Sequence, residues 1–240
     1  MIFSWLVGIL PSIALIIFLL SPGYENKTGI FHADMFFRFY SNMFLFLVLF
    51  TGYVAAKNVT SQKVDRSISL YLCRPITKID YILIKFSVLS IILTVAIILP
   101  DILLFVVTLG LLKMPFGWNI DHLWILGSIL LFGALIVVVY SLMGVAIALS
   151  SKKTSGAIAG IYIFLFLTVG LVFVMRYVLG NDYLILLSPW DVLDQVGAPL
   201  FSQALPYDVP WALSFAALMG FVSISVAMLI YNINRVEVVG

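Results

Sequence analysis

The chain has 240 residues, of which 63% are hydrophobic and only 10% are Asp, Glu, Lys or Arg. Soluble domains carry about 25% of these charged residues, so the composition excludes a soluble globular domain, a disordered chain and a coiled coil, and indicates a surface that faces lipid. The net charge of +2 is too small to indicate a nucleic-acid partner, and the single cysteine excludes a disulfide within the chain.

Six mostly uncharged runs reach the length of about 20 residues that a membrane-crossing helix requires. They are residues 2–20, 39–56, 86–112, 123–149, 156–175 and 209–231. Barrel strands would be about 10 residues long with an alternating pattern, and backbone polar groups in lipid must bond within their own segment. We therefore predict an all-α integral membrane protein whose six transmembrane helices form a single domain over residues 1–240.

The distribution of Lys and Arg predicts how the chain faces the membrane. Nine basic residues fall on one side and four on the other, and the acidic residues favour the poorer side. The richer side carries Lys57, Lys63, Arg66, Arg74, Lys78, Lys85, Lys152, Lys153 and Arg235. Because loops rich in Lys and Arg stay in the cytoplasm, we expect a multi-pass protein of the cell membrane with both termini and segment 57–85 in the cytoplasm.

Segment 57–85, between the second and third spans, is too long for a simple turn. Apolar residues recur at helical spacing from 61 to 72, which predicts an amphipathic helix along the membrane surface. Pro75 ends this helix. Thr77 and Asp80 have the spacing of a capping box, so we expect the third span's helix to begin near Lys78. The alternative is a solvated basic loop that only follows the positive-inside rule.

Segment 177–208, between the fifth and sixth spans, is also long and lies on the predicted outer side. Ser188 fits an N-cap, Pro189 fits the first helical position, and Gly197 fits the end of a short helix. An apolar stripe is formed by Leu186, Leu187, Trp190, Leu193 and Val196. We predict a short outer helix pair, interfacial or partly re-entrant, that either only shields the spans or takes part in substrate release.

Asp101 is the one charged residue well inside a predicted span, where a charge costs roughly 2.5–3.5 kcal/mol on insertion scales. Pro100 precedes it and is expected to kink the helix. Three interpretations stay open. Asp101 lines a substrate path between two permeases, or it is protonated, or it bonds to Thr94, Ser87 or a neighbouring span.

Motifs for catalysis and nucleotide binding are absent from the sequence. It contains no G-x-x-x-x-G-K-[ST], so a P-loop cannot hold ATP on this chain, and neither H-E-x-x-H nor G-x-S-x-G occurs. His32 and His122 stand alone, without a second ligand at metal-binding spacing. We therefore expect no catalytic, cofactor-binding or metal-binding residues here, and any ATP to be bound by another polypeptide.

Residues 59–85 resemble the cytoplasmic segment of the type-two ABC exporter permeases. In that family a cytoplasmic helix is followed by a Leu-rich Pro-Ile-Ser/Thr-Arg/Lys motif and a lysine that opens the third span. The matching positions are Leu70, Leu72, Arg74, Pro75, Ile76, Thr77, Lys78, Tyr81 and Lys85. The stretches 144–151 and 231–237 are also similar to the family. Gln62 stands near the place of a family glutamate, which is a departure from the pattern.

This resemblance implies the transmembrane permease subunit of an ABC-type exporter, which has no catalytic activity of its own. Two copies, or two related permease chains, would pair and associate with two ABC ATP-binding subunits in the cytoplasm. Segment 61–80 would be the coupling helix that docks in a groove of the ATPase. The contacting residues would be Gln62, Lys63, Asp65, Arg66, Arg74, Pro75 and Lys78, and Asp101 would be a candidate for the substrate path.

Two other functional classes compete with this interpretation. An ion-gradient-driven secondary carrier could use Asp101 as its proton site, although the halves of the chain show no internal repeat. An intramembrane enzyme would need at least two polar catalytic groups at membrane depth, and only Asp101 is found. The apolar composition favours a lipid-like, peptide or other hydrophobic cargo only weakly, and it does not distinguish a homodimer from a heterodimer.

Overall fold

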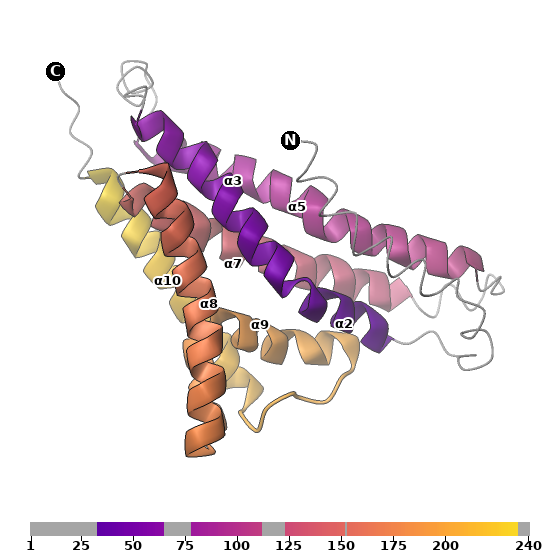
Figure 1. The fold of residues 1–240 in the computed structure, drawn as a ribbon. Helices are drawn as coiled ribbons and strands as arrows, with labels where there is room; N and C mark the ends of the chain where they lie inside the picture. The colour runs from indigo at the N-terminus through magenta and orange to yellow at the C-terminus, as the bar shows by residue number, and fades with distance from the viewer. Residues whose placement is uncertain (1–32, 65–77, 112–122, 152, 235–240) are drawn as a thin grey trace.

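The computed structural model describes residues 33–64, 78–111, 123–151 and 153–234, and the described residues contain helices and turns but no strand. The long helices are α3 (Phe44–Val64), α5 (Lys78–Leu111), α7 (Leu123–Ser150), α8 (Thr154–Leu179) and α10 (Trp211–Asn234). The shorter ones are α2 (Ala33–Asn42), α9 (Pro189–Gly197) and the 3-10 helices η1 (Asp182–Leu187) and η2 (Ala198–Phe201). Figure 1 shows their arrangement.

Four of these helices, α5, α7, α8 and α10, are long and apolar enough to cross a membrane. A fifth span is formed if α2 and α3, which meet at an angle of 48°, cross together as one broken helix. These five coincide with the predicted spans from the second to the sixth. The first predicted span, 2–20, lies outside the described residues, so the count of six stays a prediction. The chain is a multi-pass, all-helical membrane protein.

The bend between α2 and α3 was not predicted, because neither proline nor glycine marks it. It falls at Met43, whose amide donates to the carbonyls of both Phe39 and Tyr40. The two sides of the bend have different partners. Tyr40 on α2 donates to the Ile129 carbonyl of α7, whereas α3 packs mainly along α7 and α8. The bend therefore directs α2 toward the end of the bundle where α9 lies (Figure 1).

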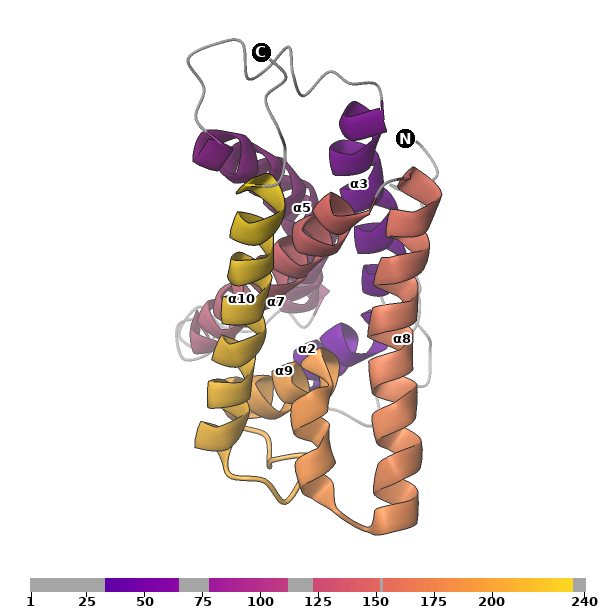
Figure 2. The ribbon, with the colours of Figure 1, turned by 90° about the vertical axis from the view of Figure 1, so that its left-hand side faces the viewer.

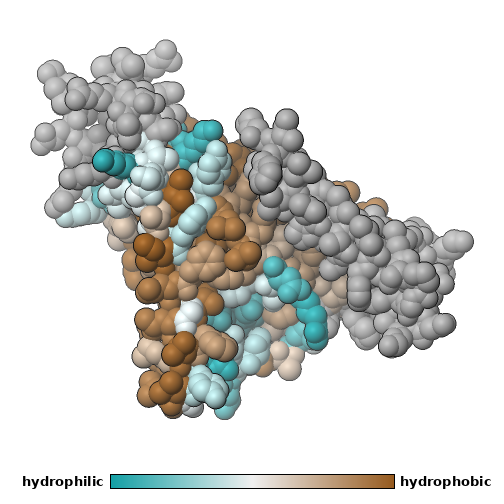
Figure 3. Space-filling view, viewed as in Figure 1, coloured by the Kyte–Doolittle hydropathy of each residue, from teal (hydrophilic) through white to brown (hydrophobic). Residues whose placement is uncertain are grey.

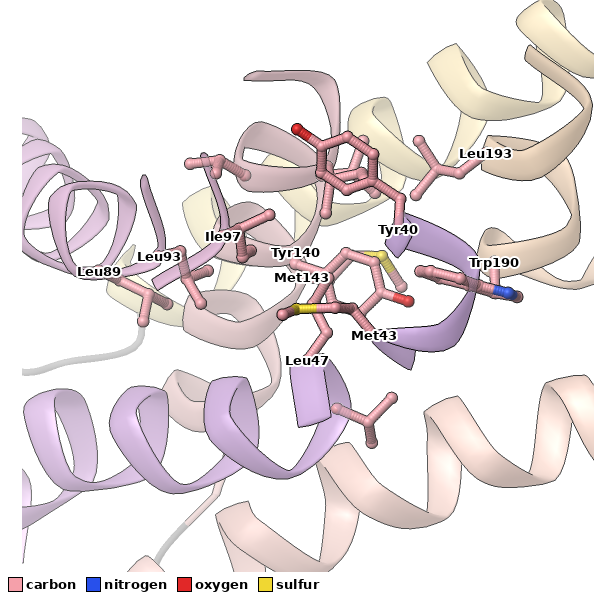
Figure 4. Close-up of a cluster of buried hydrophobic side chains, with 14 of the residues drawn as sticks. Tyr40, Met43, Leu47, Leu89, Leu93, Ile97, Tyr140, Met143, Trp190 and Leu193 are labelled. Carbon is pink, nitrogen blue, oxygen red and sulfur yellow. The ribbon is translucent and has the colours of Figure 1, made fainter. Parts of the chain in front are cut away.

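Helix α7 is the centre of the bundle. Two thirds of its apolar stretch (67%) is buried, compared with 17–28% for α5, α8 and α10. Figure 4 shows part of the core around it, where Tyr140 and Met143 of α7 meet Met43, Leu47 and Trp190. The peripheral helices leave apolar side chains exposed instead, and Figure 3 shows them as a hydrophobic surface along α8. Lipid is the environment that accepts such a surface.

The predicted outer segment folds as a compact cap. Ser188 is the N-cap of α9 and accepts a hydrogen bond from the Asp191 amide at 3.3 Å, with Pro189 at the first helical position, as predicted. Figure 2 shows α9 crossing between α8 and α10 near their lower ends. Of the predicted apolar stripe, Trp190 is buried, whereas Leu187 is 57% exposed at the surface.

Two boundaries refine the predictions. Helix α5 begins at Lys78, as expected from the capping pattern. Helix α3, however, continues without a break to Val64. Residues 61–64 therefore extend the membrane helix and do not start a separate surface helix, because their helical pattern is continuous with that of the span before them. The rest of the predicted surface helix lies outside the described residues.

Candidate functional site

The predicted coupling residues are only partly covered by the structure. Gln62 and Lys63 lie in the last turn of α3, and Lys78 is the first residue of α5. Asp65, Arg66, Arg74 and Pro75 lie outside the described residues. In Figure 1 the end of α3 and the start of α5 lie at the same end of the bundle, at the upper left. The two helix ends that flank residues 65–77 therefore lie at one face of the bundle, and the coupling role of these residues stays a prediction.

Interhelical hydrogen bonds link neighbouring helices at this end. Thr60 on α3 donates to the Ala148 carbonyl of α7 at 3.2 Å. Asn232 on α10 donates to the Ser150 hydroxyl of α7 at 2.8 Å. Asn58 on α3 also bonds to Lys85 on α5. Side-chain bonds of this kind hold helices together where hydrophobic packing alone gives no preference over lipid, so this end is a connected unit.

Asp101 lies inside the bundle, where α5 meets α2 and α7. It is completely buried, and the Tyr40 hydroxyl of α2 is a polar neighbour. That hydroxyl donates to the Ile129 carbonyl at 3.0 Å. Neither Asp101 oxygen has a hydrogen-bond partner among the described residues, so the interpretation in which Asp101 bonds to Thr94 or Ser87 finds no support, whereas the other two interpretations stay open. Its role in a substrate path stays a prediction.

The cap between α8 and α10 contains a polar cluster that holds α9 in place. Gln195 donates to the Tyr207 carbonyl at 3.0 Å and to the Val209 carbonyl at 2.7 Å, and it accepts from the Tyr207 amide at 3.1 Å. The Tyr207 hydroxyl donates to Asp191 at 3.0 Å. Ser41 of α2 donates to Asp194 at 3.2 Å. These bonds fix α9 both to the chain that leads into α10 and to α2.

Burial and neighbouring charges set the protonation of this cluster. Burial raises the pKa of the Asp194 carboxyl to about 7, opposed by the hydrogen bond from Ser41 and reinforced by the negative charge of Asp191. Burial, followed by the charge of Asp191, also raises the pKa of Tyr207. The Tyr207 phenol therefore stays protonated and remains a hydrogen-bond donor.

Arg176, in the last turn of α8, connects this helix to the cap. Its Nε atom lies 2.8 Å from an Asp182 carboxylate oxygen, and its guanidinium lies 4.5 Å from the centre of the Tyr207 ring. The other Asp182 oxygen accepts from the Asp208 amide at 3.1 Å. No short motif in the sequence marks Gln195, Tyr207 or Arg176 as members of this cluster, because they bond to residues in other elements.

Among the described residues, no three His, Cys, Asp or Glu side chains gather as metal ligands. Comparison with models of known protein families gives no match, and comparison with curated protein sequences gives none either. The order of the helices and the residues at their ends are therefore the features that bear on function.

Proposed function

We propose that this chain is the transmembrane permease subunit of an ABC-type exporter, forming the substrate path and driven by a separate ATP-binding subunit. In this proposal two copies, or two related permeases, pair in the cell membrane with both termini in the cytoplasm. The chain itself performs no catalysis, and ATP binds only to the partner.

The order of the elements is the observation that supports the proposal. A bent helix pair is followed by a basic connection over 65–77, then by the long helix α5, then by α7 and α8 with a short link between them. A folded outer segment separates α8 from α10. The type-two ABC exporter permeases, which this sequence resembles, are expected to have the same order of elements, including the outer segment between the last two spans.

Physical considerations agree with a docking role for the connection 65–77. Both helices that carry it are long, and interhelical hydrogen bonds hold their ends at one face of the bundle. A segment can transmit a movement to a membrane domain only if its two ends are anchored. Its charged residues, among them Arg66 and Arg74, suit contacts with a polar partner surface.

Copurification tests the proposal directly. The chain, tagged and expressed with the genes that neighbour its own, is purified in mild detergent and the eluate is assayed for an ATP-binding polypeptide. We expect such a polypeptide with the parent, and at least tenfold less of it with the double charge reversal R74E/K78E, because both basic contacts become repulsive.

A matched control carries K57E/K153E, which reverses two exposed basic residues at the same end of the bundle but outside the connection. This variant should retain the ATP-binding polypeptide. The proposal is wrong if no polypeptide with a P-loop copurifies even from cross-linked membranes. If both double variants lost the ATP-binding polypeptide equally, the connection would have no specific role in binding it.

An ion-gradient-driven carrier is the second candidate, and one observation favours it. Asp101 is a fully buried carboxyl with no hydrogen-bond partner among the described residues. Intramembrane acids of this kind often serve proton relays in transporters. A negative copurification result would make this candidate the stronger one.

A further inference from the structure

Asn58 of α3 and Lys85 of α5 form a reciprocal contact. Lys85 Nζ donates to the Asn58 carbonyl oxygen at 2.9 Å and to its side-chain Oδ1 at 3.3 Å. Asn58 Nδ2 donates back to the Lys85 carbonyl oxygen at 3.4 Å. The Lys85 ammonium also lies 5.6 Å from the centre of the Tyr81 ring. Two main chains are thus joined through two side chains, and we call this pair the Asn58–Lys85 clamp.

The position of the clamp relates it to the connection 65–77. Helix α3 ends at Val64 and α5 begins at Lys78, so each clamp residue lies roughly two helical turns from the connection. Lys85 is only 6% exposed. A buried ammonium has few alternatives to the partners it already holds, so the contact resists separation of the two helices.

A second point of attachment lies about one turn deeper. Ala55 of α3 and Leu89 of α5 both pack on Gly144 of α7, where an added Cβ would lie 3.2 Å from Ala55 Cβ and 3.4 Å from Leu89 Cδ2. The absence of a side chain at Gly144 lets both helices approach closely. Attachment at two successive turns fixes the angle between α3 and α5, whereas one point alone would leave a pivot.

We propose that the Asn58–Lys85 clamp is a positioning pair that makes α3 and α5 move as one rigid unit, so that a displacement of the connection 65–77 reaches both helices together. This inference rests on the proposed function for its purpose, because an ATP-binding partner would supply the displacement. The rigidity itself depends only on the contacts within this chain.

A distance measurement tests the rigidity. Spin labels are placed on the full chain at Tyr53 of α3 and Ile79 of α5, both exposed, after replacement of Cys73 by serine. The distance distribution is recorded by double electron–electron resonance in lipid nanodiscs. The parent should give one narrow distribution.

Lys85→Met removes both bonds donated by Lys85 Nζ, and Asn58→Ala removes both bonds of the Asn58 side chain. Each variant therefore loses two of the three hydrogen bonds of the clamp, and each should at least double the width of the distribution. Lys85→Arg keeps the donor and should restore the narrow width, which a general packing defect would not do. Lys153→Met removes the same charge from an exposed site at this end and should leave the width unchanged. Each of the two clamp variants tests the rigidity on its own, so the test still works if one of them fails to fold.

A narrow distribution in Lys85→Met or Asn58→Ala would overturn the proposal. The same measurement on the complex with its copurified ATP-binding subunit, with and without ATP, should keep the parent distribution narrow and the variant distribution broad. If no such subunit copurifies, the proposed function fails while the rigidity measured on the chain alone still stands. The two failures are therefore distinguishable.

Discussion

Asp194 is the residue whose environment gives the clearest pH dependence. Burial is the largest influence and raises its pKa from the usual 3.8 to about 7. Between these two values the folded protein holds a proton that the unfolded chain releases. Stability therefore falls as the pH rises from about 4 to about 7, and it changes no further above that range.

Asp194→Asn should remove this dependence. Because Asp194 is half-buried and solvent screens part of its charge, we expect the parent to lose about 1–2 kcal/mol between pH 5 and pH 8, and the variant to lose almost none of it. Thermal unfolding in detergent at both pH values measures the difference. Asp208→Asn, at an exposed position of the same segment, should keep the parent's behaviour, and the same flattening in that control would contradict the assignment.

For single residues, the sequence predicted roles that depend on near neighbours in the chain, such as helix caps, better than hydrogen bonds between distant residues. Ser188 and Pro189 mark the start of α9 within four residues, and the structure confirms both. Gln195 instead joins residues more than ten positions away, and Lys85 bonds to a residue 27 positions away. Such partners follow from the packing of whole helices, so a local pattern does not contain them.

The close contact between the end of α9 and α7 requires a glycine at position 197. Gly197 keeps right-handed helical angles (φ −75°, ψ −34°), and the chain continues directly into η2. Helix α9 ends at Gly197, as the sequence predicted, but this residue does not adopt a left-handed conformation. An added Cβ would overlap the ring of Phe132. That ring is fully buried and lies 5.1 Å from the Tyr40 ring and 5.8 Å from the Phe201 ring, centre to centre, so it has little room to move.

Gly197→Ala should lower the free energy of unfolding by about 1–3 kcal/mol, because overpacking displaces a closely packed ring. Thermal unfolding and protease sensitivity of the outer segment measure the effect. The matched control is Gly127→Ala in α7, where an added Cβ meets nothing within 4 Å. The control should leave stability equal or slightly higher, and an equal loss in both variants would refute the steric explanation.

The apolar runs predicted where the four membrane-crossing helices and the bent pair of α2 and α3 lie, because length and hydrophobicity are properties of one segment. They did not predict the bend at Met43, which contains no helix-breaking residue and accompanies contacts of α2 with α7 and α9. They also did not identify α7 as the central helix. All spans are hydrophobic on every side, since lipid and a protein core accept the same side chains.

At the scale of the whole molecule, the two ends of the bundle differ in character. One end is closed by the cap that contains α9, whose polar groups bond to one another, as Gln195 and Tyr207 do. The opposite end gathers the end of α3 and the start of α5 (Figure 1). A movement applied at that end would enter a connected set of helices, which is the arrangement that the proposed exporter subunit requires.

Site-specific photo-cross-linking in intact cells tests the central claim most directly. A photoreactive amino acid replaces Arg74, and a control replaces Tyr177, which is 87% exposed near the end of α8 at the outer cap. The account predicts that position 74 forms an adduct with a polypeptide that carries a P-loop and that position 177 does not. An adduct with no ATP-binding polypeptide from position 74, or the same adduct from position 177, would contradict it.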